Sequence, residues 1–208
     1  MVNIEKFTIE DVKRAKEFAY KFHGMERCIV ISEPKTKHLE SVANKVRNKG
    51  NLYLILAYLH DILDYAEYTT KNRLITEIKK EFGDYIYNLL VECSDNFKIE
   101  DISTPLGQEL FTRRIKEIKC PEGVSDPAAA VILAEKVCNL EAMYDEILKT
   151  KSKGDYWQDL KDNHGLCKED VKVFYETIYE IIALRCYNDI RLRGMIDLYD
   201  DLMYRIFE

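Results

Sequence analysis

The sequence predicts an all-α fold, and three observations support this prediction. Gly and Pro are scarce, with eight and four residues in a chain of 208, whereas a loop-rich sandwich or barrel needs more turn residues. Apolar residues recur three and four positions apart, as Leu39, Val42 and Val46 do, which is the period of an amphipathic helix. The stretch 51–65 is apolar on nearly all sides, and its length favours a buried helix over a central strand.

Boundary signals divide the chain into helices and loops. Thr8 precedes two acidic residues and is typical of a helix N-cap, and Gly83 interrupts a helical pattern. Polar, irregular sequence predicts loops at 24–34 and 94–105, and we expect the second loop to lie over a site. The predicted helices are 9–23, 37–48, 51–65, 69–82, 84–93, 106–119, 126–149, 168–187 and 190–207.

Charge, hydropathy and cysteine spacing exclude several functional classes. The net charge is −6 and no basic patch is present, so we expect no nucleic-acid partner. No apolar run is long enough to span a bilayer and no apolar signal core begins the chain, so we expect a cytoplasmic protein with no membrane partner. The six cysteines are scattered without a CxxC pair, which is typical of reduced thiols rather than zinc ligands or disulfides.

A His-Asp pair lies near the end of the apolar stretch 51–65. His60 is followed directly by Asp61, and Asp64 comes about one turn later, so the three side chains project in neighbouring directions. Two carboxylates and an imidazole beside a buried helix are costly without partners, and a divalent cation is the simplest partner. Mn²⁺, Fe²⁺, Zn²⁺ and, less well, Mg²⁺ suit such donors. The alternative is that these residues form a solvated helix end.

Two further residues are candidate ligands. Glu135 lies on an otherwise apolar face of the helix predicted at 126–149, where a carboxylate is rarely buried unpaired. It is either a metal ligand or the partner of a Lys or Arg from another helix. Asn139, four residues later, is then a contact to substrate or to the ligands. His38 offers another nitrogen, although a lone His at the start of a helix is more often a surface residue.

Four motifs follow one another along the chain, and together they resemble a known family. They are HDILDY at 60–65, Phe82-Gly83, LLVECSD at 89–95 and LAEKVCN at 133–139. Their order resembles the HD phosphohydrolase superfamily, and most closely the hydrolase domain of RelA/SpoT-type alarmone enzymes, including the small stand-alone forms. That family has HDxxED, a Phe-Gly pair, a valine-rich stretch ending in Thr-Asp, and LADKxxN. The ordered set is specific, although each motif alone is not.

The resemblance implies a fold and a domain organisation. We expect an HD-domain helical bundle with additional C-terminal helices, formed as a single domain by residues 1–208. The metal-site core occupies about 9–150, and the C-terminal helices about 154–208. Those last helices are rich in tyrosine, whose side chains either pack in the core, line the mouth of the site or form the surface of a possible homodimer.

The resemblance also implies a role for individual residues. His38, His60 and Asp61 match three of the family's Mn²⁺ ligands, and Glu135 falls where the fourth, an aspartate, is expected. Mn²⁺ is therefore the implied cofactor, and another divalent metal is possible. Asp64 takes the place of the first acidic catalytic residue, a glutamate. The implied substrate contacts are Arg27, Asn139 and Tyr175.

The sequence departs from the family's motifs close to the implied site. Tyr65 replaces the second acidic residue of HDxxED. Asp64 is one methylene shorter than the expected Glu, and Glu135 is one methylene longer than the expected Asp. The stretch SEPKTK precedes His38, where the family usually has a Pro-Tyr-Ile-type run. These changes make metal binding a safer expectation than turnover.

The function implied is a metal-dependent phosphohydrolase that removes pyrophosphate from the 3′ position of a guanosine tetra- or pentaphosphate. A metal-activated water attacks phosphorus, and Asp64 takes or relays the proton. Arg27, Arg113 or Arg114 neutralises phosphate charge, unless the Arg113-Arg114 pair is solvated. Two alternatives stay open: an HD-domain hydrolase of another nucleotide phosphate, and a degenerate HD domain that binds a nucleotide or a partner protein.

Overall fold

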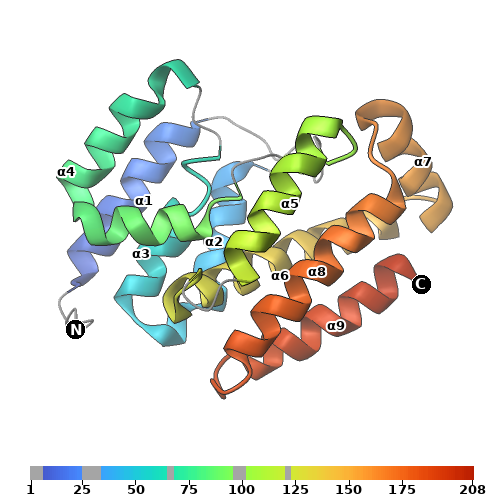
Figure 1. Ribbon diagram of the computed structural model, residues 1–208. Coiled ribbons are helices and arrows are strands. Elements are labelled where there is room, and N and C mark those ends of the chain that lie inside the picture. The colour runs from blue at the N-terminus through green and yellow to red at the C-terminus, as the bar shows by residue number, and fades with distance from the viewer. Residues whose placement is uncertain (1–6, 25–33, 65–67, 96–101, 120–122) are drawn as a thin grey trace.

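Helices account for the regular structure of the part of the chain that the computed structural model describes, which is residues 7–24, 34–64, 68–95, 102–119 and 123–208. The predicted all-α class is therefore confirmed. None of the helices within these ranges is long and apolar enough to cross a membrane. The elements are α1 Ile9–His23, α2 Lys35–Lys45, the 3₁₀ turn η2 Arg47–Lys49, α3 Asn51–Leu59, α4 Tyr68–Cys93, α5 Pro105–Lys119, α6 Asp126–Lys149, α7 Lys153–His164, α8 Lys168–Cys186 and α9 Arg193–Phe207 (Figure 1).

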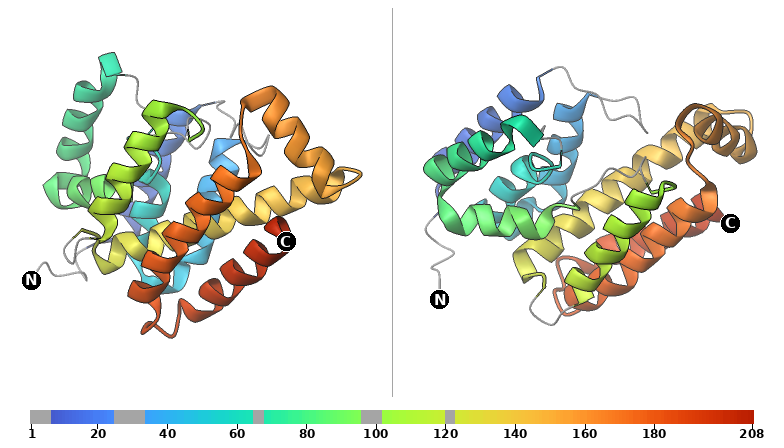
Figure 2. Two further views of the ribbon diagram at one scale, coloured as in Figure 1. Left: turned by 45° about the vertical axis from the view of Figure 1, so that its right-hand side comes forward. Right: turned by 45° about the horizontal axis from the view of Figure 1, so that its top comes forward.

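Helix α6 is the central element of the fold. Every residue from Ala128 to Ala134 is buried, because neighbouring helices cover this segment on all sides. The right-hand view of Figure 2 shows α6 running between α1–α4 on one side and α8 and α9 on the other. Both groups of helices therefore contribute to one hydrophobic core that contains α6. The helices packed against α6 are α2, α3, α4, α7, α8 and α9.

Helix α3 is as apolar as predicted, but it ends earlier. It stops at Leu59 rather than near residue 65, and tight turns follow, with the Asp64 amide donating to the Asp61 carbonyl over 3.1 Å. The side chain of His60 gives a physical reason. Its Nδ1–H donates to the Ala57 carbonyl at 2.8 Å, an acceptor that a continuing helix would use for the amide of Asp61.

Helix α4 bends sharply within its length, as Figure 1 shows. The bend is at Gly83, whose φ of 84° and ψ of 166° belong to a region that essentially only glycine adopts. The predicted interruption at this glycine is confirmed. The second half of α4 ends at Cys93, so the bend determines where the chain reaches Ser94 and Asp95.

The helix starts predicted at 9, 51, 126 and 168 are confirmed, but one whole helix was missed. Thr8 caps α1 in a capping box with Asp11, as the sequence predicted. Helix α7 was not among the predicted helices, although the sequence has a boundary residue at each end. Ser152 caps its N-terminus by accepting the Asp155 amide, and Gly165 closes its C-terminus in the left-handed region with φ 69°.

The tyrosines of the C-terminal helices divide between core and surface. Tyr175 of α8 and Tyr199 of α9 are buried, and the Tyr199 hydroxyl donates to the Tyr175 carbonyl at 2.8 Å. Tyr187 and Tyr204 are exposed. The two central tyrosines therefore pack in the core, and one of them, Tyr175, is also a predicted substrate contact.

Candidate metal centre

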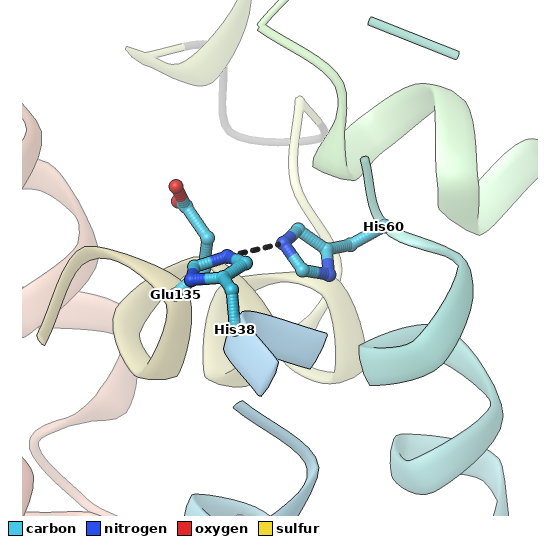
Figure 3. A group of neighbouring side chains, drawn as sticks. All are labelled: His38, His60 and Glu135. Atoms are coloured by element: carbon cyan, nitrogen blue, oxygen red, sulfur yellow. Dashed lines mark hydrogen bonds between the residues drawn. The ribbon is translucent and has the colours of Figure 1, made fainter. Parts of the chain in front are cut away.

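Three of the predicted ligands, His38, His60 and Glu135, form one buried group. Each offers a ligand atom, and these atoms all lie within 4.8 Å of one another. The side chains come from α2, from the turn after α3 and from α6 (Figure 3). His38 is only 2% exposed, although a lone His at the start of a helix is more often a surface residue. Its burial follows from the packing of α2 against both α3 and α6.

The two imidazoles face each other through their Nε2 atoms, which are 3.4 Å apart (Figure 3). Because the Nδ1–H of His60 donates to the Ala57 carbonyl, its Nε2 carries the lone pair in the neutral ring. Burial and the nearby Lys35 ammonium hold the pKa of His38 well below its usual value, so His38 is neutral near pH 7. Two facing ring nitrogens in the core need either a shared proton or a shared cation.

Asp61, the fourth predicted ligand, lies beside both histidines. Its Oδ2 is 3.2 Å from Nε2 of His60 and 3.6 Å from Nε2 of His38. The same oxygen forms an ion pair with Lys35, the first residue of α2. Burial alone would raise the pKa of Asp61, but His60 and Lys35 outweigh it and hold that pKa well below its usual value. His60 and Asp61 are both buried, so they do not form a solvated helix end.

Glu135 is held by two neighbours on its own helix. Its Oε1 accepts the Asn139 side-chain amide at 2.5 Å, and its Oε2 is 2.7 Å from the Lys136 ammonium. The cation beside Glu135 therefore comes from the next residue along the chain, and not from another helix. Burial raises the pKa of Glu135 above its usual value, against the opposing effect of Lys136. Asn139 contacts a candidate ligand, which is one of the two roles predicted for it.

Asp64 is anchored by the residues that follow α4. The Ser94 hydroxyl donates to Asp64 Oδ1, and the Asp95 amide donates to Oδ2 at 3.4 Å. These two donors come from a chain segment thirty residues later, so spacing alone could not predict them. Two other predicted residues, Arg27 and Tyr65, lie outside the described residues, as do residues 96–101 of the loop predicted at 94–105.

A buried charge network links α4, α5 and α6 next to this group. Lys136 Nζ is 2.6 Å from Asp95 Oδ2, and Arg114 Nε is 3.3 Å from Asp95 Oδ1. Arg114 also donates to the Glu92 carbonyl at 2.6 Å. Burial would raise the pKa of Asp95, but Lys136 and Arg114 outweigh it and lower that pKa. The carboxylate of Asp95 is therefore ionised, and it holds Lys136 beside Glu135.

The sequence did not assign roles to Lys136 and Asp95, although both lie within the motifs quoted for the resemblance. The signal available was the presence of charged residues among the apolar ones in both motifs, LAEKVCN and LLVECSD. Arg113 and Arg114 are adjacent in the sequence but lie in different surroundings in the structure. Arg113 is exposed, with Glu117 at 4.0 Å, as expected for a solvated residue. Arg114 is buried in the network, so it is not solvated, and its charge is already paired with Asp95 in the absence of a substrate phosphate.

Tyr175 is buried on α8, next to Phe174, whose ring lies 5.1 Å from the Lys136 ammonium. Burial is the main cause that raises the pKa of the Tyr175 phenol, so this hydroxyl stays protonated. Lys136 and Glu135 also act electrostatically on this phenol, so Tyr175 borders the charged network.

The residue types in this group fit a divalent cation. Imidazole and carboxylate together suit Mn²⁺, Fe²⁺ and Zn²⁺. Ligand atoms at about 2 Å from one ion are at most about 4 Å apart, so the group needs only a slight contraction to share one ion. The orientation of His60 by the Ala57 carbonyl is the kind of support that metal-binding histidines receive. His38, His60, Asp61 and Glu135 are the residues that would hold the ion.

Comparison with known proteins places the fold. No protein-family model matches the chain, and no curated protein matches its sequence. The all-α arrangement of the described helices, which the sequence predicted, is shared with a solved structure. A similar solved structure is that of a metazoan ortholog of SpoT, described as hydrolysing ppGpp and playing a role in starvation responses. The two chains align with a TM-score of 0.61 and 16% identity over 96% of this chain and 97% of the other.

Proposed function

We propose that this chain is a metal-dependent phosphohydrolase that removes pyrophosphate from the 3′ position of a guanosine alarmone such as ppGpp. The observation that carries the proposal is the buried group of His38, His60 and Glu135, with Asp61 beside the two histidines. The fold shared with a protein described as a ppGpp hydrolase supports the choice of substrate. In this proposal residues 1–208 form one HD-type domain in the cytoplasm.

Each proposed ligand has a defined part in the proposal. His38 and His60 supply their Nε2 atoms, and Asp61 and Glu135 supply carboxylate oxygens. A divalent cation, Mn²⁺ in this proposal, would lower the pKa of a water molecule and polarise a phosphoryl oxygen. Asn139 holds Glu135 in place through its side-chain amide. The buried setting strengthens each of these electrostatic interactions, because less water is present to screen them.

Asp64 is the proposed proton acceptor. Its carboxylate receives hydrogen bonds from Ser94 and from the Asp95 amide, which fix its orientation. A carboxylate held in this way accepts the proton of the attacking water when the two are within hydrogen-bond reach. The neighbouring family position is Tyr65 in this chain, so Asp64 acts without a second adjacent carboxylate.

The nucleotide contacts of the proposal are Arg27, Asn139 and Tyr175. An arginine fork suits phosphate oxygens, and a carboxamide and a phenol offer hydrogen bonds to base or sugar. The substrate is a small molecule, and the net charge of −6 argues against a nucleic-acid partner. A homodimer remains a prediction, which light scattering on the purified chain tests.

The test is pyrophosphate release from ppGpp in the presence of Mn²⁺. We expect release that stops when EDTA is added and that is lost in His60→Ala. Arg113→Ala is the matched control, because Arg113 is exposed and its ion pair with Glu117 is a distant one of 4.0 Å. This variant should keep wild-type activity. Absence of release by the wild type, while a known ppGpp hydrolase is active in parallel, contradicts the proposal.

A second candidate keeps the metal group and changes the substrate. The observation that favours it is Lys35, which lies in the SEPKTK stretch and pairs with Asp61 beside the histidines. The positive charge of Lys35 changes the electrostatic potential that a substrate phosphate meets at the metal group, and so it can change which nucleotide is preferred. A panel of nucleotide phosphates, assayed with Mn²⁺ under the same conditions, distinguishes this candidate. Faster hydrolysis of another nucleotide than of ppGpp would support it.

A further inference from the structure

Lys35 is a buried cation at the edge of the candidate metal group. Its side chain is 5% exposed, and its ammonium forms an ion pair with the Asp61 carboxylate, whose side chain is 11% exposed. Lysine is almost never buried to this extent without a partner. The position of Lys35 at the first turn of α2 places it one helical turn before His38.

The ion pair of Lys35 with Asp61 involves a carboxylate that a metal would also use. Asp61 Oδ2, the oxygen in the ion pair, is the atom that lies 3.2 Å and 3.6 Å from the two histidine Nε2 atoms. A divalent cation shared by the two histidines and Asp61 would therefore meet a carboxylate that already has a counter-charge. Two cations close to one buried carboxylate repel each other strongly, because the interior screens charge poorly.

We propose that Lys35 is an internal counter-cation that competes with the divalent metal for Asp61 and so weakens metal binding. The inference rests on the metal centre of the proposed function, and it adds a residue that sets how tightly the metal is held. In the metal-free protein Lys35 compensates the buried charge of Asp61, which would otherwise destabilise the fold. Metal binding then becomes an exchange, in which a divalent ion takes over the role of the ammonium.

A second ion pair on the same helix provides a matched control. Lys45, in the last turn of α2, forms an ion pair with Glu141 of α6 at 2.8 Å. Its partner is not one of the candidate ligands, and both side chains are more exposed than those of Lys35 and Asp61. Replacing Lys45 removes one positive charge from α2 without changing the partner of Asp61.

The test is the dissociation constant of Mn²⁺, measured by calorimetry on the full chain after metal is stripped. We expect Lys35→Met to bind Mn²⁺ at least about tenfold more tightly than the wild type, whereas Lys45→Met stays within about twofold. Circular dichroism shows whether each metal-free variant is folded. If Lys35→Met does not fold without metal, Lys35→Gln serves in its place, because it also removes the charge but keeps a hydrogen-bond donor.

The outcomes separate this inference from the proposed hydrolysis. Mn²⁺ affinity that is unchanged or weaker in the folded Lys35 variant overturns the inference, and so does the absence of Mn²⁺ binding by both the wild type and that variant. Tighter binding by the variant, together with no pyrophosphate release by the Mn²⁺-loaded wild type, supports the inference and contradicts the proposed function.

Discussion

Asp64 owes its orientation to residues far away in the sequence. Ser94 is buried, and its hydroxyl donates to one oxygen of Asp64 while the Asp95 amide donates to the other. The Asp95 side chain is in turn held by Arg114 and Lys136, and Lys136 also pairs with Glu135. The proposed proton acceptor and a proposed metal ligand are therefore positioned by one connected set of contacts.

Replacement of Asp64 by Asn tests the role of its carboxylate. Asn has nearly the same shape but cannot accept a proton, so we expect kcat for pyrophosphate release to fall by about 10²–10⁴. The Mn²⁺ dissociation constant should change by less than about twofold, because Asp64 is not one of the proposed ligands. Steady-state kinetics and calorimetry measure the two effects. A variant that keeps most of its activity would show that another group accepts the proton.

The sequence could predict the identity of these residues better than their contacts. His60-Asp61 and Glu135 stood out because polar groups interrupt apolar segments, and the ordered motifs connected them with His38. The pairings Lys35–Asp61 and Lys136–Asp95 were not predictable, since they join residues 26 and 41 positions apart on different elements. Contacts of that kind depend on how helices pack, which residue spacing within one helix does not specify.

Among the helices, the end of α3 and the bend in α4 bring the residues of the candidate site together. The end of α3 at Leu59 leaves His60 and Asp61 in a turn, where both side chains reach α2. The bend at Gly83 directs the second half of α4 towards α6, against which α4 packs. The interruption of α4 was predictable, because a glycine within a helical pattern often marks a backbone conformation that other residues do not tolerate. The early end of α3 was not, because it depends on a side-chain hydrogen bond within an apolar stretch.

Replacement of Gly83 by Ala tests the bend in α4. A Cβ at this position meets no atom within 4 Å, so the cost arises from the backbone conformation at φ 84°. We expect the free energy of unfolding to fall by about 1–3 kcal/mol in urea titrations. Gly194→Ala is the control, because Gly194 lies in α9 and its Cβ position is also open. It should be neutral or slightly stabilising, and equal effects in both variants would contradict the strain at Gly83.

At the scale of the whole molecule, α6 joins the helices of the site to the C-terminal helices. A second connection is the ion pair between Lys49 of η2 and Asp189, which lies in the turn between α8 and α9. Hydrogen bonds from Arg191 are the main cause that lowers the pKa of Asp189, and the bond from Lys49 lowers it further. This turn is therefore fastened to the start of α3 by charge as well as by packing.

The lowered pKa of Asp189 predicts how stability depends on pH. The folded pKa lies below the ordinary value of 3.8, so the contribution of Asp189 is fully present above that value. It is lost as the pH falls through the folded pKa. We expect Asp189→Asn to lower the free energy of unfolding at pH 7, and the difference from wild type to shrink as the pH falls below about 3.8. A difference that is independent of pH in urea titrations would rule out this ionic contribution.

In the proposed site, one divalent ion is held by four side chains from α2, the turn after α3 and α6. Anomalous diffraction at the manganese edge, from crystals grown with Mn²⁺, tests it most directly. We predict a single peak within bonding distance of the Nε2 atoms of His38 and His60 and of the carboxylates of Asp61 and Glu135. No peak among these residues in the presence of Mn²⁺, or a peak only at another position, would contradict the claim.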